Sequence, residues 1–312
     1  MPLKARRDLQ ISVAEDGRTT VKDPVSLQYY RLSPQEYSVF SMLNGRTTFQ
    51  QVIMDFRKQF PETVLSMDVL NRFLVDLLRS GLVTGPFAGL GQSIARRHQT
   101  QQKSERLAAW FNPLSVRVSG IDPERMLRRC DGLIRILLSR TALAGYVMVM
   151  LAAIVAIALR LELLTERLPG LGMMLTPRHL LFCALVFLLI KVLHEFAHAA
   201  VCRYFGGECH DMGILFIVCI PLFYCDVTDA WMLASRWKRI AISAAGIGLE
   251  LVLASAAGLL WWLSVPGPLH DLFLSVLLVC SINTLLFNGN PLLRYDGYHV
   301  LADLVDVPNL GN

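Results

Sequence analysis

The sequence predicts a mainly α-helical, polytopic membrane protein with about four transmembrane helices and a re-entrant segment, preceded by a small α+β winged-helix-like domain. Three observations predict this class. Hydrophobic residues make up 54% of the 312 residues, more than an ordinary soluble domain contains. Most of them gather after residue 140 in four long runs that carry almost no charge. Before residue 86, short apolar patterns alternate with turn and helix-cap residues instead.

Residues 1–85 predict the small winged-helix-like domain. Alternation around Asp16–Gly17 is typical of a β-hairpin. Ser33 and Glu36 form a capping-box pattern, which marks the start of a helix. Two further amphipathic helices and a short strand, "LVT", are expected at residues 47–60, 66–79 and 82–84.

The third of these helices is expected to bury Val69, Phe73 and Leu77, and its polar positions alternate in sign from Asp68 to Arg79. Residues 1–90 carry 11 Lys and Arg against 9 Asp and Glu. A nucleic-acid-binding surface needs a basic stripe that neutralises phosphates. We therefore predict no nucleic-acid partner.

The segments "LSPQEYSVFSMLNGRTTFQQV" and "FLVDLLRSGLV" of this domain resemble PqqD-like peptide-recognition domains. The resemblance implies that the domain holds a peptide by adding it as a strand at a sheet edge. The alternative is a purely structural cytoplasmic cap.

Residues 86–139 are expected to be a linker and an interfacial segment, in which Trp110 and Phe111 suit the headgroup level of a membrane. Residues 140–312 are expected to form the membrane-embedded domain. Its predicted spans are residues 141–159, 180–202, 240–265 and 272–293, each long enough to cross a bilayer. The apolar run 212–224 is too short to span, so we expect a re-entrant hairpin or a buried pair of strands.

Lys and Arg residues indicate the orientation of the spans. They crowd the entry to the first span and the connection between the second and third spans, which places the N-terminus in the cytoplasm. The first residues lack the apolar core of a cleavable signal peptide. The net charge of +5 is then mainly membrane anchoring. The seven cysteines form no paired framework and are expected to be free thiols, with Cys209 and His210 as an alternative second metal pair.

The segment "LHEFAHAAV" contains the candidate metal ligands and general base. His194 and His198 lie one helical turn apart, so both imidazoles can bind one zinc ion. Glu195 follows the first histidine and can serve as the general base for metal-activated water. Such groups are costly within a spanning helix unless they are paired or used, which favours a functional site.

A third ligand is expected from the end of the fourth span. The run Asn288–Pro291 breaks helical hydrogen bonding, and Asp296 follows at a matching depth, with Gly297 allowing a close backbone approach. Two histidines and an aspartate leave one position of a zinc ion open, as in catalytic sites. His299 is the competing third ligand.

The H-E-x-x-H segment and the later Asn/Pro segment that leads to Asp-Gly resemble the site-2 protease family of intramembrane zinc metalloproteases. "CDVTDAWMLASRWKRIAISAAGIGLELVLA" and "YDGYHVLADLVDVPNL" are most similar to its bacterial branch of putative peptide zinc metalloproteases. The resemblance implies one zinc ion per chain, held by His194, His198 and Asp296, with Glu195 as the base. It also implies a multi-pass protein of the bacterial inner membrane.

The sequence departs from this family in the middle span. Where the family has an asparagine that follows a glycine by four residues, this chain has Glu250 after Gly246. We expect Glu250 to be protonated and to face the substrate oxyanion, to be paired with Arg239 or Arg294, or to point elsewhere. The oxyanion role can instead fall to Asn283, Asn288 or Asn290.

The resemblance implies an intramembrane zinc endopeptidase that hydrolyses a membrane-associated or recruited peptide substrate by metal-activated water. The expected partners are this peptide or membrane-protein substrate, the lipid bilayer, and partner proteins of an export or peptide-maturation system. The alternative is a peptide-binding subunit of such a system, with a structural or vestigial metal site. A metal transporter is a third hypothesis, disfavoured because the first span has no ligating residue.

Overall fold

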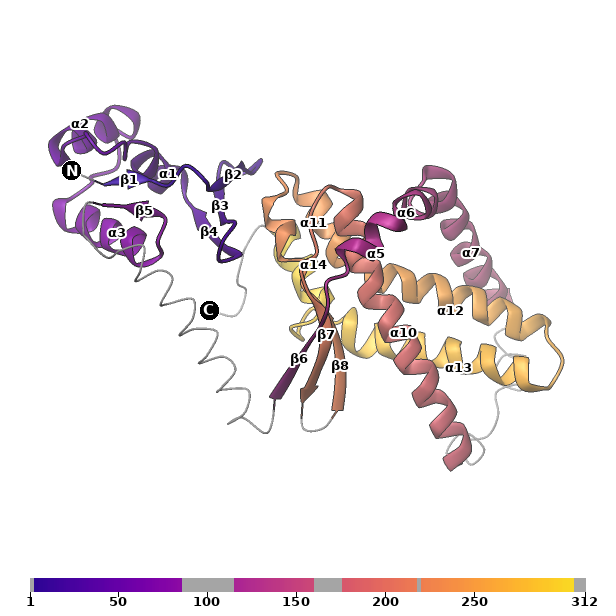
Figure 1. Cartoon of the computed structure of the whole chain (residues 1–312). Coiled ribbons are helices and arrows are strands. Elements are labelled where there is room, and N and C mark those ends of the chain that lie inside the picture. The colour runs from indigo at the N-terminus through magenta and orange to yellow at the C-terminus, as the bar shows by residue number, and fades with distance from the viewer. Residues whose placement is uncertain (1–2, 86–114, 160–175, 218–219, 306–312) are drawn as a thin grey trace. The chain divides into compact units, whose positions relative to one another are not determined.

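The computed structural model describes residues 3–85, 115–159, 176–217 and 220–305 (Figure 1). Contacts divide the chain into two compact units, Met1–Pro113 with Trp231–Ser235, and Leu114–Ala230 with Arg236–Asn312. The first is a small mixed domain and the second contains the long apolar helices. Trp110 and Phe111, expected at the headgroup level, lie outside the described residues.

Two small antiparallel sheets build the N-terminal unit. One has the order β2-β3-β4 and the other pairs β1 with β5. Gly17, in the turn between β2 and β3, has a φ of 79°, a left-handed conformation that favours glycine. The hairpin predicted at this turn is therefore confirmed. The strand bounds are Lys4–Ala5 (β1), Gln10–Val13 (β2), Thr19–Asp23 (β3), Gln28–Leu32 (β4) and Val83–Thr84 (β5).

Three capped helices cover these strands. The predicted capping box at Ser33 and Glu36 is present, a second one joins Thr48 and Gln51, and Ser66 caps the third helix. These caps satisfy backbone N–H groups that have no partner within the helix. The helices are α1 (Pro34–Ser41), α2 (Phe49–Gln59) and α3 (Met67–Arg79).

The buried face of α3 differs from the predicted one. Leu70, Leu74 and Leu77 form the buried face, whereas Val69 is 54% exposed and Phe73 is only partly buried. Two neighbouring apolar stripes fit the helical period, and the one with three leucines packs against the core. The prediction that Val69 is buried is wrong.

Four helices of the second unit are long and apolar enough to cross a membrane, as predicted. The last one continues beyond its α-helical part as a π-helix, η2. The third begins at Ala245 rather than near residue 240, because α11 (Arg236–Ser243) is a separate helix. The spanning helices are α7 (Arg140–Leu159), α10 (Pro177–Tyr204), α12 (Ala245–Leu263), and α13 (Pro268–Asn283) with η2 (Thr284–Asn288).

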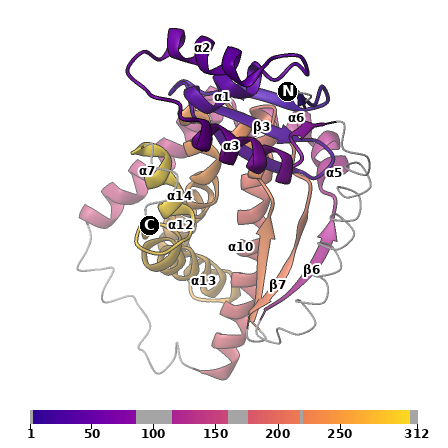
Figure 2. The ribbon, with the colours of Figure 1, turned by 90° about the vertical axis from the view of Figure 1, so that its left-hand side faces the viewer.

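The apolar run 212–224 forms a strand pair, one of its two expected forms. β7 (Met212–Ile217) and β8 (Ile220–Cys225) are antiparallel. A third strand, β6 (Ser115–Ile121), pairs with β7 and was not predicted, because it falls in the expected linker. The sheet runs beside α10, which β8 contacts (Figures 1 and 2).

The helices of this unit pack as an antiparallel pair, α12 and α13, against α10, while α7 lies on α12 (Figure 1). Two short helices, α5 (Glu124–Arg129) and α6 (Asp131–Leu137), lead from β6 to α7, and the 3-10 helix η1 (Thr228–Met232) follows β8. The last described helix is α14 (Asp296–Leu304), which packs on α11. Arg239 joins these two helices through its Nε, which donates to Asp303 Oδ1 at 2.9 Å.

Two irregularities in the helices matter for the site. The break at Ala244, between α11 and α12, releases the carbonyl of Ile242 from helical hydrogen bonding. In η2 the N–H of Gly289 donates to the carbonyl of Thr284 at 2.7 Å, the i to i+5 pattern of a π-helix. Such bulges are frequent at functional sites.

Candidate metal centre

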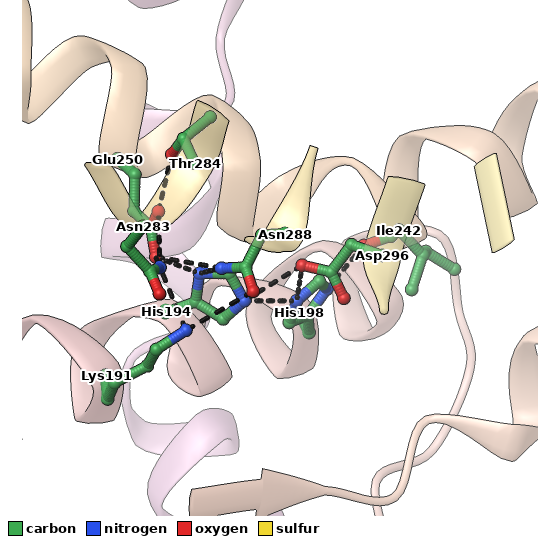
Figure 3. Close-up of polar contacts among 9 residues, drawn as sticks. All are labelled: Lys191, His194, His198, Ile242, Glu250, Asn283, Thr284, Asn288 and Asp296. Carbon is green, nitrogen blue, oxygen red and sulfur yellow. Dashed lines mark hydrogen bonds and ion pairs between the residues drawn. The ribbon is translucent and has the colours of Figure 1, made fainter. Parts of the chain in front are cut away.

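Three side chains from distant parts of the chain meet between α10 and the start of α14 (Figure 3). His194 and His198 are buried and their Nε2 atoms lie 3.2 Å apart. Asp296 Oδ2 lies 2.9 Å from His194 Nε2 and 3.3 Å from His198 Nε2. The structure thus brings the three predicted ligands together, and each offers one ligand atom to a common point.

The nearest partner of the outer nitrogen of each imidazole is an acceptor, although Asn288 Nδ2 also lies 3.4 Å from His194 Nδ1. His198 Nδ1 lies 2.7 Å from the carbonyl oxygen of Ile242, the group released by the helix break at Ala244. His194 Nδ1 lies 2.8 Å from Glu250 Oε1. A carbonyl or carboxylate oxygen only accepts, so both Nδ1 atoms carry the hydrogen and both Nε2 atoms of the neutral rings present a lone pair. The surroundings therefore orient two bare nitrogens toward Asp296.

Three acceptors at these distances repel one another unless a cation lies between them. Asp296 Oδ2 is buried and, among the described residues, has no hydrogen-bond donor. The donor set, two imidazole nitrogens and a carboxylate oxygen, fits a divalent metal ion such as zinc.

Glu250 lies behind His194 and is fully buried. Its two oxygens accept hydrogen bonds from Asn283 Nδ2 at 2.6 and 2.8 Å, from Thr284 Oγ1 at 2.5 Å, and from Asn288 Nδ2 at 3.1 Å (Figure 3). Together with the N–H of His194, these donors match an ionised carboxylate, which is acceptor-only. The π-helical turn of η2 places Thr284 and Asn288 on the face that meets Glu250.

Lys191 completes this buried network one helical turn before His194. Its Nζ lies 3.8 Å from Glu250 Oε1 and 3.4 Å from Asn288 Oδ1. When ionised, the three carboxylates of Glu195, Glu250 and Asp296 exceed the single ammonium of Lys191 by two charges. A divalent cation would balance this excess, and charge balance matters where water is scarce.

Gly246 of α12 allows His194 to occupy its place. A Cβ atom on Gly246 would lie 2.2 Å from His194 Cε1 and 2.3 Å from Nε2. Gly297 serves the third ligand in a similar way, because its Cβ would lie 2.8 Å from the backbone of Gly289. Only glycine lets the start of α14 approach η2 this closely, as expected from the sequence.

Several other predicted residues are not part of the three-ligand cluster. Glu195 is half-buried on α10, and Asn290 is half-buried, its Oδ1 accepting from the N–H of Leu292 at 3.0 Å. His299 is exposed and is not part of the cluster. The pairings of Glu250 with Arg239 or Arg294 are wrong: Arg239 pairs with Asp303, and Arg294 is exposed. Neither Cys209 nor His210 belongs to a metal cluster within the described part of the chain.

Three contributors were not predicted from the sequence. Lys191 was visible as a charge in an apolar helix, one turn from His194, and this spacing could have indicated its place. Thr284 carried no signal, because a threonine within a spanning helix commonly bonds to its own backbone. The carbonyl of Ile242 could not be predicted, since it depends on a helix break that has no proline or glycine at its centre.

Comparison with known families agrees with this site. Residues 182–267 match the model of peptidase family M50, the family of site-2 proteases. The matched residues contain His194, Glu195, His198 and Glu250, and end before Asp296. The match supports a multi-pass membrane metallopeptidase. It does not include the N-terminal unit and gives no support to the PqqD-like resemblance. No curated protein and no solved structure matches.

The contact of Gly246 with His194 yields a first prediction. Gly246→Ala should displace the imidazole and lower the metal affinity of purified protein by about 10- to 100-fold, the usual effect of disturbing a ligand's support. Elemental analysis after dialysis against graded chelator measures this. Gly248→Ala is the matched control, because a Cβ at that position of the same helix would meet no described atom within 4 Å other than the neighbouring backbone of its own helix. Equal metal content in the two variants would contradict the contact.

Proposed function

We propose that this protein is an intramembrane zinc endopeptidase that hydrolyses peptide bonds of a membrane-associated or recruited peptide. The observation that carries the proposal is the convergence of His194 Nε2, His198 Nε2 and Asp296 Oδ2, all acceptors, between helices of membrane-spanning length. The match of residues 182–267 to peptidase family M50 supports the same activity.

The zinc ion would be held by His194, His198 and Asp296. Three protein ligands leave one position for water or substrate, which distinguishes catalytic zinc sites from structural ones. When bound, zinc supplies a Lewis acid that makes water nucleophilic near neutral pH and polarises a carbonyl group.

Glu195 would act as the general base. It follows His194 on α10 and therefore projects about 100° around the helix from it. Its carboxylate has no hydrogen-bond or ion-pair partner among the described residues, so it is available for proton transfer. It would take a proton from the attacking water and deliver it to the leaving amine of the cleaved peptide.

Glu250 would position His194 rather than bind the oxyanion. The carboxylate of Glu250, held by its donors, accepts from the Nδ1–H of His194 and so leaves Nε2 free for the metal. A carboxylate commonly has this role behind a metal-bound histidine. The amide groups of Asn283 and Asn288 donate hydrogen bonds to Glu250. Of the asparagines expected at the oxyanion, Asn290 keeps an amide nitrogen that makes no described contact.

The lipid-like setting of the site favours a substrate in or beside the bilayer. Peptide bonds in a membrane are inaccessible to proteases in water, and a zinc ion held by His194, His198 and Asp296 would supply reactive water at that depth. The arginines before α7 support a cytoplasmic N-terminus, and the proposed location is the bacterial inner membrane.

The N-terminal unit would recruit the peptide. β2 is an edge strand of its sheet, and Ile11 and Val13 on it are 47% and 54% exposed. An edge strand with exposed apolar side chains can accept a further strand from a partner. The proposed partners are the peptide substrate and the proteins of a peptide-maturation or export system that deliver it.

Deletion of residues 1–85 tests the recruiting role. The truncated protein should keep its zinc, since the three ligands lie after residue 190, and should cleave a recruited peptide at least about tenfold more slowly. Elemental analysis and a cleavage assay measure the two effects. If deletion leaves cleavage of every peptide unchanged, the unit does not recruit the substrate.

Substitutions at the centre test the activity itself. His194→Ala, His198→Ala and Asp296→Ala should each remove most of the zinc from protein purified in detergent. Glu195→Gln should retain zinc and slow hydrolysis by about 10²–10⁴-fold, the usual contribution of a general base. The measurements are zinc content and cleavage of a fluorogenic peptide library in detergent micelles.

His299→Ala is the matched control, because it changes an exposed histidine of α14 near Asp296. If this variant loses zinc while Asp296→Ala keeps it, the assignment of the third ligand fails. If the wild-type protein binds zinc but shows the same cleavage as Glu195→Gln, the chain has no peptidase activity of its own. It is then a peptide-binding subunit with a structural metal.

Glu250→Gln separates positioning from oxyanion binding. A neutral amide would weaken the hold on His194 and turn an NH₂ group toward other donors, so zinc affinity should fall by about 10- to 100-fold. Ser275→Ala is the control, since among the described residues this fully buried hydroxyl of α13 bonds only to its own helix, at the carbonyl of Asp271. Unchanged zinc affinity with slower hydrolysis would show that Glu250 acts on the substrate instead.

A further inference from the structure

Two cysteines lie together at the open end of the β7–β8 hairpin. The Sγ atoms of Cys209 and Cys225 are 3.1 Å apart. Cys209 precedes β7 and is almost fully buried, whereas Cys225 ends β8 and is half-buried. Both are free thiols. Cys219, between the two strands, lies outside the described residues.

The hairpin itself holds the two thiols in place. Cys225 pairs in register with Met212, and the N–H of Asp226 donates to the carbonyl of Asp211 at 2.8 Å. Tyr224 Oη donates to Asp211 Oδ2 at 2.6 Å across the same two arms. These contacts hold the two arms of the hairpin together next to the cysteines, so the backbone keeps the two thiols close to each other.

The spacing suits a disulfide better than a shared metal. A disulfide places its sulfurs about 2.05 Å apart, so the two thiols need to approach by only about 1 Å. Two thiolates on one tetrahedral zinc ion would lie about 3.8 Å apart, given Zn–S bonds of about 2.3 Å. The metal-ligating group found in the described part of the chain contains neither cysteine.

We propose that Cys209 and Cys225 form a thiol–disulfide exchange site that takes a disulfide-bearing compound, R–S–S–R, as its oxidant. The thiolate of Cys225, the more exposed of the two, attacks one sulfur of the compound and releases one RS⁻, leaving a mixed disulfide on Cys225. The thiolate of Cys209 then attacks Cys225 Sγ and releases the second RS⁻. The dithiol loses two electrons and two protons, and the compound leaves as two RSH.

The exchange should be slow at neutral pH and faster in alkali. The hydrogen bond with Cys209 and the burial of the thiol raise the pKa of Cys225, and the negative charge of Glu195 acts in the same direction. The attacking thiol of Cys225 is therefore mainly protonated at neutral pH, and the site responds to sustained oxidising conditions.

A disulfide between Cys209 and Cys225 would join the two arms of the hairpin near the metal centre. Cys209 and Cys225 pack in one cluster with Ala199 and Phe196 of α10, and Phe196 follows Glu195 in the sequence. A bond between the cysteines would close a loop that contains both strands. Separation of β7 from β8 should then become rarer, because the cross-link limits the open states of the hairpin.

Exchange with oxidised glutathione tests the site in the full-length, detergent-purified chain. After incubation at pH 8, free thiols are blocked with a maleimide and the protein is analysed by intact mass and by peptide mapping without reduction. We expect loss of two thiols with no retained glutathione, a cross-linked pair of peptides containing Cys209 and Cys225, and slower hydrogen exchange in β7 and β8. Glutathione retained on Cys225 without the cross-link, or a cross-link to another cysteine, would overturn the proposal.

Three variants sharpen the test. Cys225→Ser should abolish closure, and Cys209→Ala, which keeps an apolar side chain at a buried position, should retain one glutathione on Cys225. Cys183→Ser, which changes a half-buried thiol of α10 distant in sequence from the pair, should close like wild type. Closure that persists in Cys209→Ala, or that is lost in Cys183→Ser, contradicts the assignment. None of these readouts depends on zinc or on hydrolysis.

Discussion

Mutual repulsion among three acceptor atoms is the constraint on which the arrangement of the second unit, the one with the spanning helices, depends. His194 Nε2, His198 Nε2 and Asp296 Oδ2 lie within 3.3 Å of one another, with their lone pairs turned inward. The surrounding structure keeps them so, because the carbonyl of Ile242 and the carboxylate of Glu250 hold the protons of both rings on the outer side. In a region of low dielectric this arrangement is costly unless a cation completes it. The surrounding residues thus orient all three acceptors toward the point where a metal ion would bind.

The irregular parts of the helices serve this arrangement. A regular helix across Ala244 would satisfy the carbonyl of Ile242 internally and leave His198 without its acceptor. The π-helical turn η2 faces Thr284 and Asn288 toward Glu250, and Gly289 and Gly297 let the chain turn back so that Asp296 reaches the histidines. Broken helices in a membrane are tolerated where protein buries the freed backbone, and here the freed groups are used by the site.

Much of this could be predicted because its signals are local. Apolar runs, capping boxes and the spacing of His194 and His198 depend on near neighbours in the sequence, and they gave the spanning helices, the helices of the N-terminal unit and the candidate ligands. The role of Glu250 could not be predicted in this way. Burial in an apolar span favoured a neutral carboxyl group, but four donors and Lys191 come from other turns and other helices, and together they favour the charge. β6 was missed for the same reason, since its partner β7 lies far along the chain.

X-ray absorption at the zinc edge tests the central claim most directly. Detergent-purified wild-type protein loaded with one equivalent of zinc should show a first shell of nitrogen and oxygen only, at about 2.0–2.2 Å, with the outer-shell scattering of two imidazoles. That result would place the ion on His194, His198 and a carboxylate. A sulfur shell at about 2.3 Å would place the ion on cysteines instead, and would contradict the assignment of the metal to this cluster.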